Sequence, residues 1–300
     1  MFIGIDGGGT RTVAVLVDDA GRERARVEGA AGRVDIRAPQ DAAAVLIDLA
    51  RAAARDGGAD RVTALCAALA GAGREPERTR VEDALRAAGL AAVTTVVTDA
   101  EAAMCDAFGT GPGILLIAGT GSIAWGRGED GRVARTGGWG HLLGDEGSGY
   151  AIGLAALRAV LRAHDGRGLP TRLENGVLAA TRLSAPELLV HFVVNAGKSD
   201  VAALAPLVFA EADQDAVALG IIEDAARALA GHVAALYTRL RPWSMPVPIA
   251  FSGGLVSNGR PLRPVVLDAL AEWELALALH TADVDPARGA ATLAREYARA

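Results

Sequence analysis

The chain has 300 residues, of which 51% are hydrophobic and 22% charged, so it is long enough for two globular domains and is not a disordered protein. The net charge is −6 and no block of basic residues stands out, which argues against binding to nucleic acid. Arginine heavily outnumbers lysine, which is typical of a high-GC coding bias. The two cysteines lack metal-ligand spacing, which predicts reduced thiols. The chain starts in a strand and has no apolar run long enough to span a membrane, so we expect a cytoplasmic protein with no membrane partner.

A glycine-rich turn between two strands opens the chain. The apolar run 2–6 precedes three glycines, and the β-branched run 12–17 reads as the second strand. Such a turn offers free backbone N–H groups to a phosphate, the aspartate could hold a divalent cation through water, and the threonine hydroxyls could donate to phosphate oxygens. A hairpin without ligand is the alternative, whereas Rossmann and Walker loops must open a helix and are excluded. The candidate residues are Asp6, Gly7, Gly8, Gly9, Thr10 and Thr12.

The first unit continues with alternating helices and strands. The hydrophobic patterns predict a strand at 22–29, a loop at 30–39, a helix at 40–56, a strand at 61–69, a helix at 76–88 and a strand at 94–98 that ends at Asp99.

A second unit then repeats the first. Strand 114–118, the turn Gly119-Thr120-Gly121-Ser122, strand 123–127 and strand 132–136 follow the opening pattern closely enough to predict an internal duplication. Residues 146–240 are mostly helical, with breaks at 166–170, 184–186 and 197–200; strand 248–251, the turn Ser252-Gly253-Gly254, helix 261–273, strand 275–279 and a helix from 286 complete the chain. The expected fold is α/β with two domains, 1–112 and 113–300. As an alternative, the last helix packs back on the first domain.

These motifs resemble those of the actin/hexokinase superfamily of ATPases, which has a ribonuclease H-like fold. The first and second glycine turns resemble its two phosphate loops, and Ser252-Gly253-Gly254 resembles its adenosine loop. The pair Thr98-Asp99 and the block 137–148, Gly-Gly-Trp-Gly-His-Leu-Leu-Gly-Asp-Glu-Gly-Ser, resemble more narrowly the BadF/BadG/BcrA/BcrD-type ATPase family and, within it, the N-acetylglucosamine kinases. The resemblance covers nearly the whole chain.

The resemblance implies duplicated βββαβα units around an interdomain cleft, and a kinase that moves the γ-phosphoryl group of ATP to an amino sugar, with Mg²⁺ near Asp6. It implies Asp99 as general base and Asp145 as a ligand of sugar hydroxyls, although both aspartates could instead cap helices. Trp139 could stack on the sugar, but we favour a core position, and His141 is expected to be structural. A homodimer is expected by analogy. The ATP-binding residues implied are Asp6, Gly7, Gly8, Gly9, Thr10, Thr12, Gly119, Thr120, Gly121, Ser252, Gly253 and Gly254, and the sugar-binding residues are Gly71, Asp99, Thr120, Gly138, Trp139 and Asp145.

Two positions depart from the pattern of this family. Ile123 stands where the animal N-acetylglucosamine kinases carry an asparagine, and residues 32–35, Gly-Arg-Val-Asp, lack the asparagine of the loop after the third strand. Two amide contacts to the sugar are therefore missing, and glucosamine, glucose, N-acetylmuramic acid or another amino sugar stay open as acceptors.

The sequence bears on three other functions. An activator ATPase of 2-hydroxyacyl-CoA dehydratases would hold an iron–sulfur cluster through cysteines, but Cys66 and Cys105 fall in a strand and a helix interior. A sugar-responsive regulator would need a helix-turn-helix, for which the chain has no room before its first strand. A catalytically silent sugar- or nucleotide-binding protein stays open.

Overall fold

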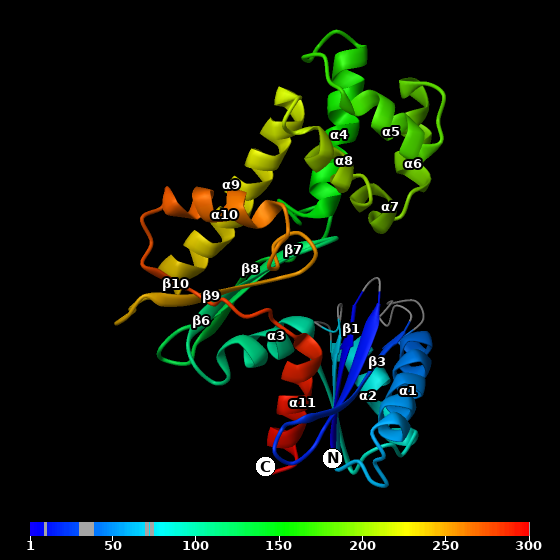
Figure 1. The fold of residues 1–300 in the computed structure, drawn as a ribbon, viewed down its shortest axis with the longest axis vertical. Coiled ribbons are helices and arrows are strands. Elements are labelled where there is room, and N and C mark those ends of the chain that lie inside the picture. The colour runs from blue at the N-terminus through cyan, green and yellow to red at the C-terminus, as the bar shows by residue number, and fades with distance from the viewer. Residues whose placement is uncertain (9–10, 30–38, 70–71, 73–74, 300) are drawn as a thin grey trace. The chain divides into compact units, whose positions relative to one another are not determined.

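The computed structural model describes residues 1–8, 11–29, 39–69, 72 and 75–299 of the chain, with the side chains of 39–41 outside the description (Figure 1). The candidate residues Gly9, Thr10 and Gly71 and most of the expected loop 30–39 lie outside these ranges. The chain forms two compact units, one of residues 1–111 with 284–300 and one of residues 112–283. The second domain expected over 113–300 therefore ends at Asp283, and the last helix belongs to the first unit.

The first unit is built on a five-stranded sheet of order β3-β2-β1-β4-β5. Strands β1 and β2 are antiparallel and joined by the first glycine turn, while β4 and β5 run parallel to β1. The carboxyl ends of β1, β4 and β5 thus meet at one edge of the sheet, where ligands of open α/β sheets collect. The strand bounds are β1 Phe2–Gly7, β2 Thr12–Val17, β3 Glu23–Gly29, β4 Ala64–Leu69 and β5 Val93–Thr98.

Helices cover both faces of this sheet, so β1, β2 and β4 are nearly continuously apolar. Helices α1 (Pro39–Asp56) and α2 (Glu75–Ala87) pack on the face of Ile3 and Leu65, and α3 (Asp99–Phe108) and α11 (Pro286–Tyr297) on the face of Phe2 and Cys66. Figure 1 shows α11, drawn in red, beside α3. An ion pair of Arg288 with the buried Asp106 carboxylate (2.6 Å) ties these two helices together.

Two glycines let α11 approach its neighbours. A Cβ added at Gly4 would overlap the α11 backbone, and one added at Gly289 would overlap the carbonyl oxygen of Ala102 on α3. We predict that Gly289→Ala destabilises the protein by roughly 1–3 kcal/mol through overpacking. Gly220→Ala is the matched helical control, because a Cβ there meets nothing within 4 Å, and it should gain about 0.5–1 kcal/mol. Urea unfolding of both variants checks this, and equal midpoints would contradict the predicted close contact.

The second unit repeats the sheet of the first. Its order is β10-β9-β6-β7-β8, with β6–β7 and β7–β8 antiparallel and β9 parallel to β6. Strands β6, β7 and β8 pair as β1, β2 and β3 do. Strand β9 lies on the other side of β6, as β4 lies on the other side of β1. The predicted duplication and α/β fold class are confirmed. The strand bounds are β6 Gly113–Ala118, β7 Ser122–Arg127, β8 Val133–Gly137, β9 Val247–Ser252 and β10 Leu277–Leu279.

The helices of the second unit pack on one face of its sheet around the long helix α9. The predicted breaks at 166–170 and 184–186 are confirmed, but the break at 197–200 is shorter than predicted because a helix already begins at Lys198. The helix bounds are α4 Gly149–His164, α5 Leu173–Thr181, a 3-10 turn η1 Pro186–Leu188, α6 Leu189–Asn195, α7 Lys198–Ala202, α8 Ala205–Glu211, α9 Ala216–Arg239 and α10 Leu262–Ala271.

No single helix among the described residues is long and apolar enough to cross a membrane, and one bent pair, Leu173–Thr181 with Pro186–Asn195, meets the length and composition required.

Candidate active site

Asp6 lies at the carboxyl end of β1, half-buried and paired in register with Val13 and Ala68. Burial raises the pKa of its carboxyl to about 7, with Asp99 and Asp285 adding to the increase and Arg11 opposing it. The repulsion from Asp99 indicates that these two predicted functional carboxylates lie near one another in the first unit. A cation at this point would compensate both charges.

The first glycine turn is closed by its own backbone. The Gly8 N–H donates to the carbonyl oxygen of Arg11 at 3.0 Å, and Gly7 pairs with Thr12 across the two strands. The Arg11 guanidinium forms an exposed ion pair with Glu28 at 3.5 Å. Thr12 is fully buried in β2.

Asp99 is the first residue of α3, directly after β5. The helix cap is Thr98, whose hydroxyl accepts from the Glu101 N–H at 3.2 Å while the Glu101 carboxylate accepts from the Thr98 N–H at 2.8 Å. The alternative role of Asp99 as a helix cap is therefore wrong. Its carboxylate is half-buried, accepts from the Ala100 N–H at 3.0 Å, and has a pKa raised above its ordinary value because burial outweighs this hydrogen bond.

The second and third glycine turns lie side by side at the ends of the parallel strands β6 and β9. A Cβ on Gly119 would lie 3.8 Å from the Gly254 nitrogen, and the Leu255 N–H donates to the Ala118 carbonyl at 3.0 Å. Gly253 has a φ of +101° and sits where a Cβ would overlap the Ala118 backbone, so this turn requires glycine.

The N-terminus of α4 is directed at the second turn. The Gly149 N–H donates to the Gly119 carbonyl at 2.8 Å, and the Tyr150 N–H donates to the Thr120 carbonyl at 3.3 Å. These bonds fix the turn, and the positive end of the helix dipole favours an anion near it.

Asp145 is buried and adopts a left-handed backbone conformation with φ +59°. Its Oδ1 accepts from the Ser122 N–H at 3.2 Å, and its Oδ2 lies 2.7 Å from the Nζ of Lys198. Helix α4 begins at Gly149 with Ser148 as its cap, so the alternative role of Asp145 as a helix cap is also wrong. A strained backbone at a buried charge is typical of functional sites.

Trp139 is 65% exposed, so the core position that we favoured is wrong. The Arg135 guanidinium lies 4.3 Å from the centre of its ring. Gly138 precedes it with φ +70°, and its N–H donates to the Ser122 carbonyl at 3.1 Å, which places the loop beside the second glycine turn. The exposed His141 packs its ring edge-on against Tyr150, with centroids 4.9 Å apart.

The predicted residues thus form two groups, one in each unit. The first unit brings together Asp6 and Asp99, and the second brings together the second and third glycine turns, Gly138 and Asp145. Sequence reasoning missed Lys198 and the left-handed conformation of Asp145.

The cysteines lie inside the first unit. Cys66, on β4, and Cys105, on α3, are both buried, and burial strongly raises the pKa of the Cys66 thiol. Buried thiols of this kind do not suit an iron–sulfur cluster shared between subunits.

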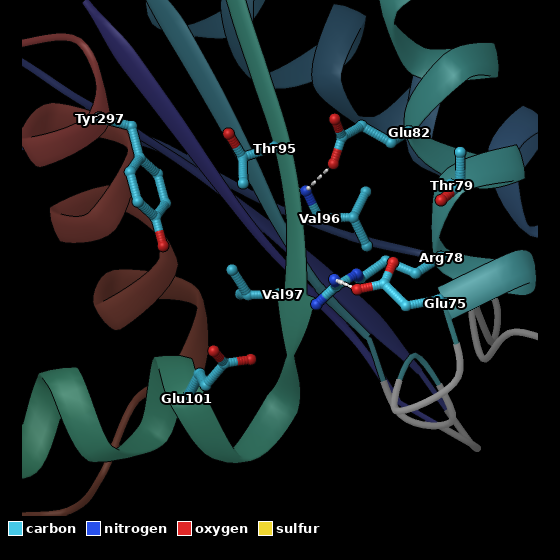
Figure 2. Close-up of a pocket in the computed structure, with 9 residues that line it drawn as sticks. All are labelled: Glu75, Arg78, Thr79, Glu82, Thr95, Val96, Val97, Glu101 and Tyr297. Carbon is cyan, nitrogen blue, oxygen red and sulfur yellow. Dashed lines mark hydrogen bonds and ion pairs between the residues drawn. The ribbon is translucent and has the colours of Figure 1, made fainter. Parts of the chain in front are cut away.

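A pocket of about 310 Å³ lies at the edge of the first sheet, outside both groups of predicted residues (Figure 2). The Glu82 carboxylate accepts from the Val96 N–H at 3.1 Å, and Glu101 accepts from the Thr98 N–H, so glutamates occupy outward donors of the edge strand β5. This arrangement protects an exposed strand edge from pairing with another chain. The lining residues are Glu75, Arg78, Thr79, Glu82, Thr95, Val96, Val97, Glu101 and Tyr297.

The residues present fit a magnesium ion that arrives with a nucleotide. No group of three or more His, Cys, Asp or Glu side chains in the described part of the chain could hold a metal ion alone. Mg²⁺ ordinarily keeps several waters and binds through one or two carboxylates and substrate phosphates. Asp6 is half-buried, and burial and nearby carboxylates raise the pKa of its carboxyl, so it suits the role of the carboxylate that holds Mg²⁺.

Comparison with known proteins supports a single family. The model of the BadF/BadG/BcrA/BcrD ATPase family matches residues 3–294. The chain is 34% identical to an N-acetylmuramic acid/N-acetylglucosamine kinase of Clostridium acetobutylicum over 85% of each chain. It is 30% identical to an N-acetyl-D-glucosamine kinase of Dictyostelium discoideum, covering 98% of this chain and 97% of the other.

Solved structures share the fold. A structure from Chromobacterium violaceum, described as a candidate N-acetylglucosamine kinase, has a TM-score of 0.81 and 28% identity over 97% of each chain. A glucokinase of the ROK family from Streptomyces griseus, in complex with glucose and AMPPNP, has a TM-score of 0.58 and 20% identity over 98% of this chain and 99% of that one, which bears on the fold alone. On the extent of the family match and the identity to both relatives, the chain belongs to the BadF/BadG/BcrA/BcrD ATPase family.

Proposed function

We propose that the protein is an ATP-dependent hexosamine kinase that transfers the γ-phosphoryl group of ATP to the 6-hydroxyl of an amino sugar such as N-acetylglucosamine or glucosamine. The observation that carries the proposal is the pair of carboxylates Asp6 and Asp99, which lie at the carboxyl ends of β1 and β5 in the first unit, where the charge of Asp99 adds to the raised pKa of Asp6. Two relatives at 30% identity or above are named as kinases of N-acetylated amino sugars, which supports the substrate class.

In this proposal Asp99 is the general base. Its carboxylate accepts the proton of the sugar hydroxyl as that oxygen attacks the γ-phosphorus and the bond to the β-phosphate oxygen breaks. A raised pKa makes the carboxylate a stronger proton acceptor than an ordinary aspartate once it is ionised. Asp6 would hold the Mg²⁺ that accompanies ATP, and that ion would supply neutralisation of phosphate charge.

The glycine turns bind the phosphates in this proposal, because phosphoryl transfer depends mainly on alignment and charge neutralisation. Gly7 and Gly8 serve the first phosphate loop, Gly119–Gly121 the second, and Ser252–Gly254 the adenosine. The dipole of α4, directed at the second turn, adds a favourable field for phosphate oxygens. Asp145 and Trp139 serve the sugar, the carboxylate accepting from hydroxyls and the exposed indole stacking on the ring.

The acceptor is tested by ADP release from purified protein with Mg²⁺ and ATP. The panel is N-acetylglucosamine, glucosamine, N-acetylmuramic acid, glucose and a blank without sugar. The proposal expects ADP release that depends on an amino sugar and exceeds the blank at least about tenfold. ATP binding without sugar-dependent release would instead favour the catalytically silent binding protein.

A further inference from the structure

Lys198 is the only lysine among the 30 Lys and Arg residues of the chain. In a composition this biased toward arginine, a single lysine is unusual and draws attention to the space around its head group. Lysine carries a compact ammonium and arginine a broad planar fork, so they differ most where space is limited. A single lysine in such a composition fits a position where the space for the head group is limited.

The surroundings of Lys198 are of this kind. Its Nζ lies 2.7 Å from the Oδ2 of Asp145, whose side chain is 5% exposed, while the lysine side chain is 23% exposed. A Cβ added at Gly121 would lie 2.6 Å from this Nζ and 2.9 Å from the Oδ1 of Asp145. The absence of a side chain at Gly121 thus makes room for the ion pair against the second glycine turn.

The backbone around Lys198 is arranged to bring it there. Helix α7, which begins at Lys198, packs against α4 at two glycines: a Cβ at Gly153 would overlap the Val201 carbonyl, and one at Gly149 would lie 3.5 Å from the Ala202 carbonyl. The same helix α4 donates to the carbonyls of the second turn. One rigid element therefore fixes both the turn and the lysine.

Asp145 depends on this neighbour. Its two oxygens are held separately, Oδ1 by the Ser122 N–H and Oδ2 by the ammonium, on a backbone with φ +59°. Without the ammonium the buried carboxylate would keep one hydrogen bond and an uncompensated charge, which is costly and favours reorientation.

We propose that Lys198 is a positioning residue for the sugar site: its compact ammonium holds the Asp145 carboxylate in the orientation that accepts sugar hydroxyls. The inference rests on the proposed function, in which Asp145 binds the sugar. Lys198 acts through Asp145 and leaves the nucleotide to the glycine turns.

The test uses the full-length protein and measures sugar affinity apart from turnover. Calorimetry without ATP gives the Kd for N-acetylglucosamine and for N-acetylmuramic acid, and steady-state assays give KM for sugar and for ATP. Lys198→Met should weaken sugar binding at least about tenfold, with the KM for ATP within about twofold of wild type. Arg227→Met, which removes one exposed cation from α9, is the control and should change neither constant.

A double-mutant cycle separates positioning from general stability. In an Asp145→Asn background, Lys198→Met should change the sugar Kd less than about twofold, because the group it positions is gone. Lys198→Arg should fail to restore wild-type affinity, since the larger head does not fit beside Gly121. Thermal unfolding of each variant shows that the compared proteins are folded.

Several results would overturn the assignment. These are an unchanged sugar Kd in Lys198→Met, additive effects with Asp145→Asn, full wild-type affinity in Lys198→Arg, or a loss confined to N-acetylmuramic acid, whose lactyl carboxylate the ammonium would then contact directly. Wild-type protein that neither binds nor phosphorylates any sugar overturns the proposed function instead, so the two failures are distinct.

Discussion

An Asp99→Asn variant is expected to lower kcat for sugar phosphorylation about 10³-fold while leaving sugar binding within a few fold of wild type. Asparagine keeps the shape of the side chain and one oxygen that can accept from the Ala100 N–H, but it cannot accept the proton of the attacking hydroxyl. Helix α3 should persist, because Thr98 and Glu101 cap it without help from Asp99. Initial rates at saturating ATP and sugar give kcat, and calorimetry gives the sugar Kd.

The control for this variant is Asp83→Asn, an exposed aspartate of α2 that pairs with Arg86 and should retain wild-type activity. The pH dependence provides a second check. Since burial raises the pKa of Asp99, kcat/KM for the sugar should fall as pH drops through that raised value and the base becomes protonated. An Asp99→Asn enzyme that keeps more than a tenth of wild-type kcat would contradict the role of Asp99 as base.

An Asp6→Asn variant is expected to lower kcat/KM for Mg²⁺-ATP by roughly 10–100-fold, as for the loss of a group that holds a metal through its waters. The raised pKa of Asp6, about 7, adds a signature that does not depend on turnover. At pH 6 the Asp6 carboxyl of the free protein is mostly protonated, whereas the form that holds the metal is ionised. Binding of Mg²⁺-ATP should therefore release close to one proton. At pH 8.5 it should release almost none.

Calorimetry in buffers of different ionisation enthalpy measures this proton release, and Asp6→Asn should abolish its pH dependence.

The free energy of unfolding of the unliganded protein should also depend on the ionisation of Asp6. Between the unfolded value of 3.8 and the folded value of about 7, the unfolded chain loses a proton that the folded chain keeps, so rising pH destabilises wild type. The free energy of unfolding of Asp6→Asn, compared with that of wild type, should therefore be higher at pH 8 than at pH 4. The expected difference between the two pH values is roughly 2 kcal/mol after allowance for partial solvent screening. Identical pH profiles would contradict the raised pKa.

The architecture was predictable because its signals are local. Apolar runs ending in glycine turns identified β1, β6 and β9, and the repeat of strand, glycine turn and strand predicted the duplicated sheets. Helix bounds agree closely as well, with 76–88 predicted where α2 spans Glu75–Ala87.

The details of the site depend on backbone geometry that composition does not reveal. The helix predicted from Glu146 begins at Gly149, because Asp145 and Gly147 adopt left-handed conformations and Ser148 is the cap. Trp139, by residue type a core residue, is exposed because its glycine neighbours at 138 and 140, both with positive φ, shape an open loop. Lys198 reaches Asp145 only through the packing of α7 on α4. Its uniqueness as the chain's lysine was the one available signal in the sequence.

The most direct measurement is the identity of the phosphorylated product. Wild-type protein is incubated with Mg²⁺, ATP and N-acetylglucosamine, and the products are separated and analysed by mass spectrometry and ³¹P NMR. The predicted result is a sugar monophosphate whose phosphorus couples to the protons on C6, formed in equal amount with ADP and formed about 10³-fold more slowly with Asp99→Asn. Inorganic phosphate as the only new phosphorus species, with the sugar recovered unchanged, would contradict a sugar kinase.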